Sequence, residues 1–278
     1  MQKHLNIAAG LAVGVCYFVL AGSAHAQQWY NTTQQATPVA PPTQEAKETK
    51  DWNYTIGGGV GYAPTYEGSD EYDVLPVPVV NIDYKDGLFF ANVRHGIGSY
   101  PLRGENYKVG VSLGYASGRD ESDDRKNLTG MGDVDASATA NLLAEYDFGP
   151  AKLSGRVTSA VSGDYGTTAE VNLGSRYPLT QKIIMSGSIG TMWADEEHMS
   201  NRFGVNAGQS AASGYNQHDA ESGIKSVGFS AGATYLLTDR WNANLTFRGD
   251  KLLGDAADSP VVKDDFVPAV FLTTSYKF

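Results

Sequence analysis

Apolar and polar residues alternate along several segments of the chain downstream of Trp52. Between residues 270 and 278 the even-numbered positions are mostly apolar and end with Tyr276 and Phe278, with the polar Lys277 between them. The same alternation is found in residues 169–177, 227–237 and 241–248. Because successive side chains of a strand point to opposite faces, each segment is predicted to be a strand with one apolar and one polar face.

Two kinds of connection separate these segments. Short turns, such as residues 85–87 and 238–239, alternate with long polar stretches, such as residues 194–222. Outer-membrane barrels have short periplasmic turns, longer outer loops and an even number of strands, so the sequence predicts an all-β, antiparallel transmembrane β-barrel with twelve strands. The predicted strands are residues 52–63, 72–84, 87–94, 97–102, 106–117, 134–148, 151–162, 167–178, 182–194, 223–237, 240–251 and 267–278. Merging the short pair around His95 gives ten strands as the alternative.

Aromatic residues support a membrane barrel over a secreted β-sandwich. Those beside the predicted short turns are Tyr84, Phe148, Tyr177, Tyr235, Trp241 and Phe278, and those near the outer ends are Tyr62, Tyr115, Trp193 and Phe247. Two such girdles are favoured by the two interfaces of a bilayer. A C-terminal Phe is typical of the closing strand of outer-membrane barrels, so Tyr276 and Phe278 are predicted to act as an assembly signal.

The first residues predict export. Residues 1–26 combine a short positive start, an apolar stretch and a small-residue cleavage signal ending at Ala26, which is typical of a cleaved signal peptide. Residues 27–51 are rich in Pro and Gln without periodicity and are predicted to be a disordered periplasmic tail, whereas residues 52–278 form the barrel. The single cysteine, Cys16, lies in the signal peptide, so the exported chain is predicted to contain no disulfide. The predicted location is the outer membrane of a Gram-negative bacterium.

The net charge and the spacing of the histidines argue against nucleic-acid binding, catalysis and metal binding. The formal net charge is −10, which disfavours binding to phosphate backbones, so no nucleic-acid partner is expected. His95 and Ser99 are the nearest candidate pair for a lipid-acting enzyme, but no third group orients them. His198 and His218 share a loop with several carboxylates, although their spacing matches no compact zinc site. We therefore expect a non-enzymatic protein with no catalytic residue, metal or cofactor.

Charged residues also fall on the polar face of the predicted strands. The predicted lumen-facing charges are Asp135, Glu145, Arg156, Glu170, Arg176 and Arg248. Charges of both signs on neighbouring strands favour ion pairs that close the lumen, but the same residues could line a narrow water-filled pore.

One set of motifs carries a family resemblance. Residues 57–72, with the sequence GGGVGYAPTYEGSDEY, residues 75–78 (LPVP) and the terminal Tyr276-Lys277-Phe278 resemble the MltA-interacting protein (MipA/OmpV) family. The resemblance implies an outer-membrane scaffold that links a lytic murein transglycosylase with a murein synthase. Outer-membrane lipid and lipopolysaccharide would surround such a barrel. A narrow channel for small solutes or ions is the alternative function, and a lipid-modifying enzyme is a further one.

Overall fold

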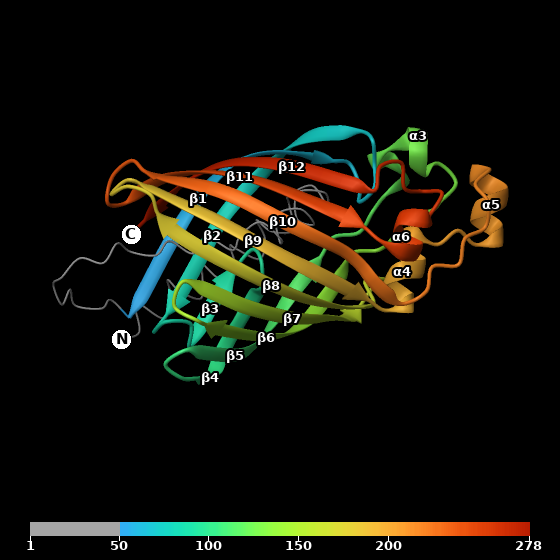
Figure 1. Cartoon of the computed structure of the whole chain (residues 1–278). Coiled ribbons are helices and arrows are strands. Elements are labelled where there is room, and N and C mark those ends of the chain that lie inside the picture. The colour runs from blue at the N-terminus through green and yellow to red at the C-terminus, as the bar shows by residue number, and fades with distance from the viewer. Residues whose placement is uncertain (1–50) are drawn as a thin grey trace, which may run out of the picture.

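The computed structural model describes residues 51–278, which form a closed antiparallel barrel (Figure 1). Its strands are β1 (Trp52–Pro64), β2 (Tyr72–Tyr84), β3 (Phe89–Asn92), β4 (Gly96–Arg103), β5 (Tyr107–Ala116), β6 (Ser137–Asp147), β7 (Ala151–Ser162), β8 (Thr167–Pro178), β9 (Ile183–Ala194), β10 (Gly223–Leu236), β11 (Trp241–Leu252) and β12 (Phe266–Lys277). The prediction of a twelve-stranded antiparallel barrel is confirmed. The predicted signal peptide and, apart from Asp51, the predicted tail lie outside the described residues.

The first and last strands close the barrel. They pair antiparallel over eight residue pairs, and the Phe278 amide donates to the Tyr54 carbonyl oxygen at 3.0 Å. Glycines make this seam possible, because a Cβ at Gly59 would stand 2.0 Å from the carbonyl oxygen of Leu272. Gly57 is equally crowded against β12. The glycine-rich first strand therefore serves a close approach of two backbones.

The barrel wall is polar inside and apolar outside. Along β6, Thr139, Asn141 and Leu143 are buried, whereas Ala140 and Leu142 face outward and are exposed. Most other strands show the same alternation, with large apolar side chains on the outer face. Because an apolar outer belt is favourable in contact with lipid, this wall is suited to span a bilayer.

The two ends of the barrel differ in structure. The five short turns lie at the end where β1 begins and β12 ends, and the helices lie at the opposite end (Figure 1). These helices are η1 (Glu121–Asp123), α3 (Arg125–Leu128), α4 (Glu196–Phe203), α5 (Ala207–Ser213) and α6 (Gly254–Asp258). We call the helical end, which comprises residues 65–71, 117–136, 195–222 and 253–265, the outer cap.

The outer cap is folded, whereas the sequence indicated only long polar loops. Tyr66, Leu128, Met131, Val205 and Val261 come from four different loops and form a small buried core. Capping side chains begin α3, α4 and α5: the Asp195 carboxylate, for example, accepts the amide of the third residue of α4 at 2.9 Å. Among the described residues no helix is long and apolar enough to cross a membrane.

The hairpin formed by β3 and β4 is much shorter than its neighbours. The sequence predicted a strand over residues 87–94, but β3 contains only four residues. Lys85 and Asp86 adopt left-handed backbone conformations, and the Leu88 amide donates to the Lys85 carbonyl oxygen. Residues 87 and 88, which were predicted to begin the strand, therefore belong to the preceding turn. The tip of this hairpin, residues 93–95, therefore stops within the barrel wall.

Candidate functional site

A buried charge cluster lies inside the barrel. Arg156 of β7 and Glu170 of β8 are cross-strand partners in register, and both project into the lumen. Arg156 Nη2 lies 2.6 Å from Glu170 Oε2, and Arg94 Nη2, from the tip of the β3–β4 hairpin, lies 2.8 Å from Glu170 Oε1. The side chains of Arg94 and Glu170 are only 6% and 5% exposed. One carboxylate thus holds two guanidinium groups, and we call Arg94, Arg156 and Glu170 the lumen triad.

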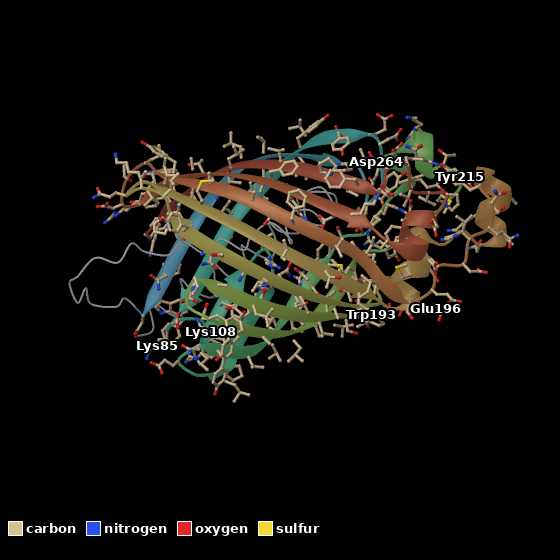
Figure 2. All side chains as sticks on the ribbon, viewed as in Figure 1. Lys85, Lys108, Trp193, Glu196, Tyr215 and Asp264 are labelled. Atoms are coloured by element: carbon tan, nitrogen blue, oxygen red, sulfur yellow. The ribbon has the colours of Figure 1, made fainter. Side chains whose placement is uncertain are left out.

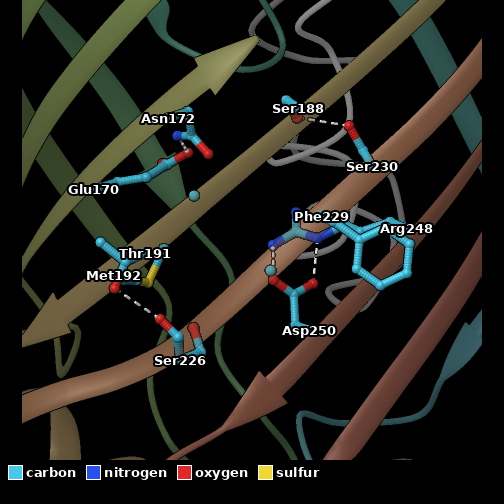
Figure 3. A pocket seen from close by; sticks show the side chains of 12 residues that line it. Glu170, Asn172, Ser188, Thr191, Met192, Ser226, Phe229, Ser230, Arg248 and Asp250 are labelled. Atoms are coloured by element: carbon cyan, nitrogen blue, oxygen red, sulfur yellow. Dashed lines mark hydrogen bonds and ion pairs between the residues drawn. The ribbon is translucent and has the colours of Figure 1, made fainter.

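A second ion pair faces the lumen triad from β11. Arg248 and Asp250 are two residues apart on one face of this strand and form a salt bridge. Figure 3 shows them across a small cavity of about 30 Å³ from Glu170 and Asn172, and Asn172 donates its side-chain amide to Glu170. Residues from β7, β8, β11 and the β3–β4 hairpin therefore meet at one level of the lumen.

A larger cavity of about 80 Å³ lies between the lumen triad and the outer cap. Its lining includes five cationic side chains, those of Arg94, Arg156, Arg202, Lys225 and Arg248. Lys225 Nζ is bound 2.7 Å from the Glu67 carboxylate. The lining is dominated by cations, so the cavity presents a positive surface.

Some donors of the lumen triad and of the neighbouring Arg248 lack partners in the part of the chain that the structure describes. Arg94 Nε and Nη1 and Arg248 Nη1 are buried without a hydrogen-bond acceptor. A buried donor that is left unsatisfied costs about 1–3 kcal/mol, more when it is charged. These atoms are therefore positions at which an added acceptor would bind favourably.

The outer cap contains buried titratable groups as well. The Tyr66 hydroxyl donates to the Val261 carbonyl oxygen at 2.8 Å, and burial raises the pKa of Tyr66 well above its ordinary value. Arg119 Nη1 donates to a backbone carbonyl of α4 at 2.7 Å, and burial lowers the pKa of Arg119 to about 10. His198 Nδ1 lies 2.8 Å from the Tyr165 carbonyl oxygen, and burial, with help from neighbouring cations, holds the pKa of His198 well below 6.5.

The structure distributes the predicted lumen charges unevenly. Arg156, Glu170 and Arg248 meet in or beside the lumen triad, and Glu145 accepts from the Tyr100 hydroxyl at 3.1 Å nearer the short turns. Arg176 is half-buried on β8. The prediction that Asp135 faces the lumen is wrong, because β6 begins only at Ser137. Asp135 is exposed in the loop before β6, and its backbone amide donates to the Asp164 carboxylate.

Arg94 is the member of the lumen triad that could not be identified from the sequence. It lies in the hairpin tip next to His95, where no alternation identifies a face. One signal was available: the predicted strands 87–94 and 97–102 are short. A hairpin this short places its charged tip at the depth of the membrane.

The predicted terminal aromatics lie at the short-turn end. Tyr276 packs on Trp241 and Phe278 with ring centroids 5.2 Å and 4.8 Å apart. The Tyr276 hydroxyl also accepts from Arg240 at 3.0 Å. The last three residues are thus held to the neighbouring strand by side chains and to β1 by the backbone.

The two histidine arrangements considered from sequence have simple structural surroundings. The His95 ring packs against Phe90, and no hydrogen bond joins the side chains of His95 and Ser99. His218 Nε2 lies 2.8 Å from a backbone carbonyl of α6. Within residues 51–278, no group of three or more His, Cys, Asp or Glu is arranged to hold a metal ion.

A closed barrel with a charged interior and an apolar belt defines the class of the protein, an outer-membrane β-barrel. Residues 56–278 match the family described as MltA-interacting protein MipA, and the chain belongs to this family. The MltA-interacting protein of Escherichia coli (strain K12) is 24% identical over 236 residues, which cover 81% of this chain and 90% of the relative. The MltA-interacting protein of Shigella flexneri matches to the same extent.

Solved outer-membrane barrels are similar in general form. The COG4313 outer membrane channel from Pseudomonas putida F1 aligns over 87% of this chain and 100% of its own, with 12% identity and a TM-score of 0.43. The NanC porin aligns over 81% of this chain and 100% of its own, with 8% identity and a TM-score of 0.43.

Proposed function

We propose that this protein is a non-catalytic outer-membrane platform that binds a lytic murein transglycosylase at its short-turn end. The observation that carries the proposal is family membership across nearly the whole barrel, with relatives whose name states an interaction with MltA. A transglycosylase that works on murein is reached from the periplasm, and the short turns of an outer-membrane barrel face that compartment.

A charged surface at the short-turn end supports this role. Arg103 Nη1 donates to the Lys85 carbonyl oxygen at 2.6 Å, and Lys108 Nζ lies 3.0 Å from the Asp86 carboxylate. These contacts join the β2–β3 turn to the β4–β5 turn. Figure 2 shows Lys85 and Lys108 close together at this end. We call Lys85, Asp86, Arg103 and Lys108 the turn patch, and a charged patch of this kind suits a protein partner.

The lumen triad favours a platform over an open channel. Its ion pairs join the β3–β4 tip to β7 and β8 through the interior, where a conducting path would have to run. The charged lining still makes a narrow channel the second candidate. Planar-bilayer recording decides between them: the platform predicts a silent purified barrel, and a conductance that changes in Arg176→Ala would support the channel.

Co-purification from native envelopes tests the platform. The variant with Lys85→Glu, Arg103→Glu and Lys108→Glu should recover much less transglycosylase than the unaltered protein. The matched control carries Lys126→Glu and Lys263→Glu in the outer cap and should recover the usual amount. No association with the unaltered protein would reject the proposal.

The same proposal includes a murein synthase as second partner and residues 27–51, the tail, as a docking segment. Deleting residues 27–51 measures what the tail contributes. If the platform links the two enzymes, the synthase should be recovered from envelopes that contain the transglycosylase and lost from those that lack it. Recovery of the synthase regardless of the transglycosylase would point to independent binding.

A further inference from the structure

The strand pairing of the barrel wall is interrupted on the side of the short hairpin. β2 pairs with β3 only from Asn81 to Tyr84, so residues 72–80 have no strand partner on that side. β5 pairs with β4 only as far as Leu113, which leaves residues 114–116 of β5 similarly unpaired. We call the opening between these two edges, above the hairpin tip, the wall opening.

Two prolines lie on the free edge of β2. Backbone bonds at Lys85–Asp51 and Thr65–Glu71 show that odd-numbered residues of β2 bond to β1, because bonded positions alternate in an antiparallel pair. The even-numbered residues therefore direct their backbone groups toward the wall opening. Pro76 and Pro78 are two of these residues and have no N–H to leave unsatisfied.

This placement suits an edge that faces lipid without a strand partner. An unpaired N–H in the hydrocarbon region costs several kcal/mol, and the prolines remove two of them. They also make the edge a poor template for an added strand. The edge is therefore adapted to remain open and not to pair with a polypeptide.

The wall opening lies at the depth of the apolar belt, and the outer cap borders it at its outer end. Tyr62 and Tyr72 stack at 5.2 Å near the outer end of β1 and β2, where the outer aromatic girdle is expected. Beyond the girdle, α3 docks on the loop between β1 and β2, where the Asn127 amide donates to Asp70 at 2.9 Å and the Ser69 hydroxyl donates to Asp124 at 3.0 Å. Contacts of the outer cap thus bridge the two sides above the opening.

The 80 Å³ cavity borders the wall opening on the side of β5 and the hairpin tip. Gly114, Tyr115 and Ala116, which lack a partner on the β4 side of β5, line it together with Arg94 from the hairpin tip. Its other charged lining residues are Arg156, Arg202, Lys225, Arg248, Glu67 and Asp250. Counting Glu170, which is bound to Arg94, five cations face three carboxylates, an excess of two positive charges.

Arg94 identifies the chemistry that the cavity would accept. The residue is 8% exposed, and two of its three guanidinium nitrogens, Nε and Nη1, have no acceptor among the described residues. Each of these N–H groups can donate a charge-assisted hydrogen bond to an oxygen of a phosphate or carboxylate. The third nitrogen remains on Glu170, so the side chain is already held in place.

We propose that the wall opening and the cavity that borders it form a binding site for an anionic amphiphile from the membrane. The acidic headgroup, a phosphate or carboxylate, pairs with Arg94 in the cavity. The acyl chain leaves through the wall opening past Pro76 and Pro78 and lies against Val74 and Leu113, which are 68% and 67% exposed. This site is independent of the turn patch at the opposite end of the barrel.

Titration of the purified full-length barrel in a neutral maltoside detergent tests the site, with native mass spectrometry as the readout. The probe is dodecyl phosphate, with inorganic phosphate and dodecyltrimethylammonium as comparison ligands. The expected result is one dodecyl phosphate per barrel, at least about tenfold weaker binding of inorganic phosphate, and no specific binding of the cation.

Three variants locate the site. Arg94→Gln should weaken dodecyl phosphate binding by at least about tenfold, since it removes a charge-assisted pair. Gly114→Phe should weaken it similarly, because a side chain there points toward Asn141 and Thr139 and fills the cavity beside the opening. Arg176→Gln, a lumen arginine away from the cavity, is the control and should bind normally.

Heat-modifiable electrophoresis checks that each variant is a folded barrel, and the Gly114→Phe variant keeps the test valid if Arg94→Gln does not fold. Equal affinity in Gly114→Phe and the unaltered barrel would overturn the proposal. So would equal binding of the cationic amphiphile, which would indicate adsorption to the belt. Inorganic phosphate binding as tightly as dodecyl phosphate would overturn the membrane origin of the ligand.

Discussion

The lumen triad makes a quantitative prediction for Glu170→Gln. The substitution keeps the size of the side chain and removes the one carboxylate that holds both Arg94 and Arg156. Breaking a buried ion pair costs about 3–5 kcal/mol, because the remaining charge stays desolvated without its partner. Two guanidinium groups lose their partner here, so we expect the free energy of unfolding to fall by about 3–5 kcal/mol.

The matched control is Glu71→Gln in the outer cap. Glu71 pairs with Lys126 at 2.5 Å, but the two side chains are 50% and 61% exposed. Exposed pairs contribute about 0–1 kcal/mol, so this variant should unfold almost like the unaltered protein. The comparison separates the effect of burial from the effect of replacing a glutamate.

Urea unfolding in phospholipid vesicles, followed by tryptophan fluorescence, measures both variants. A double-mutant cycle with Arg94→Gln adds a second readout, because the double variant should cost less than the sum of the two single variants. A Glu170→Gln barrel that unfolds within about 1 kcal/mol of the unaltered protein, with no coupling to Arg94, would refute the view that the triad stabilises the closed lumen.

Three further predictions concern assembly, closure and pH. Deleting Phe278 should lower the yield of folded barrel in the envelope without changing the composition of any complex that does form; normal yield by heat-modifiable electrophoresis would contradict its assembly role. Gly59→Ala should impair barrel closure, since its Cβ would meet the β12 backbone at 2.0 Å, whereas Gly58→Ala has 3.5 Å to its nearest neighbour and should fold normally; the same electrophoresis compares them. His198 has a folded pKa below its unfolded value near 6.5, so the unfolded loop binds more protons and the outer cap should lose stability as pH falls below about 6.5. Limited proteolysis between pH 8 and pH 5 should therefore show earlier cleavage of the cap at acidic pH, and an identical acid response in His198→Asn would assign the effect to another group.

Part of the lumen cluster could be predicted from the sequence and part could not. Arg156 and Glu170 lie on strands with clean alternation, and parity alone directs them inward. Asp135 was assigned to the lumen by the same parity, but the strand begins two residues later, and outside a strand alternation no longer determines direction. Arg94 lies in a turn, where the alternation rule gives no answer at all.

The sequence by itself determined the number of strands, the inner and outer faces of most of them, the two strands that close the barrel and the lipid that surrounds the wall. These properties depend on a period of two residues and on turn lengths, which are local along the chain. Only the tertiary structure decided which distant residues meet. The Arg94–Glu170 pair joins residues 76 positions apart, and the wall opening exists because one hairpin is too short to cover its neighbours. Such contacts depend on the length and register of every strand around the barrel. A local pattern of alternating residues contains no information about how these registers add up around the barrel.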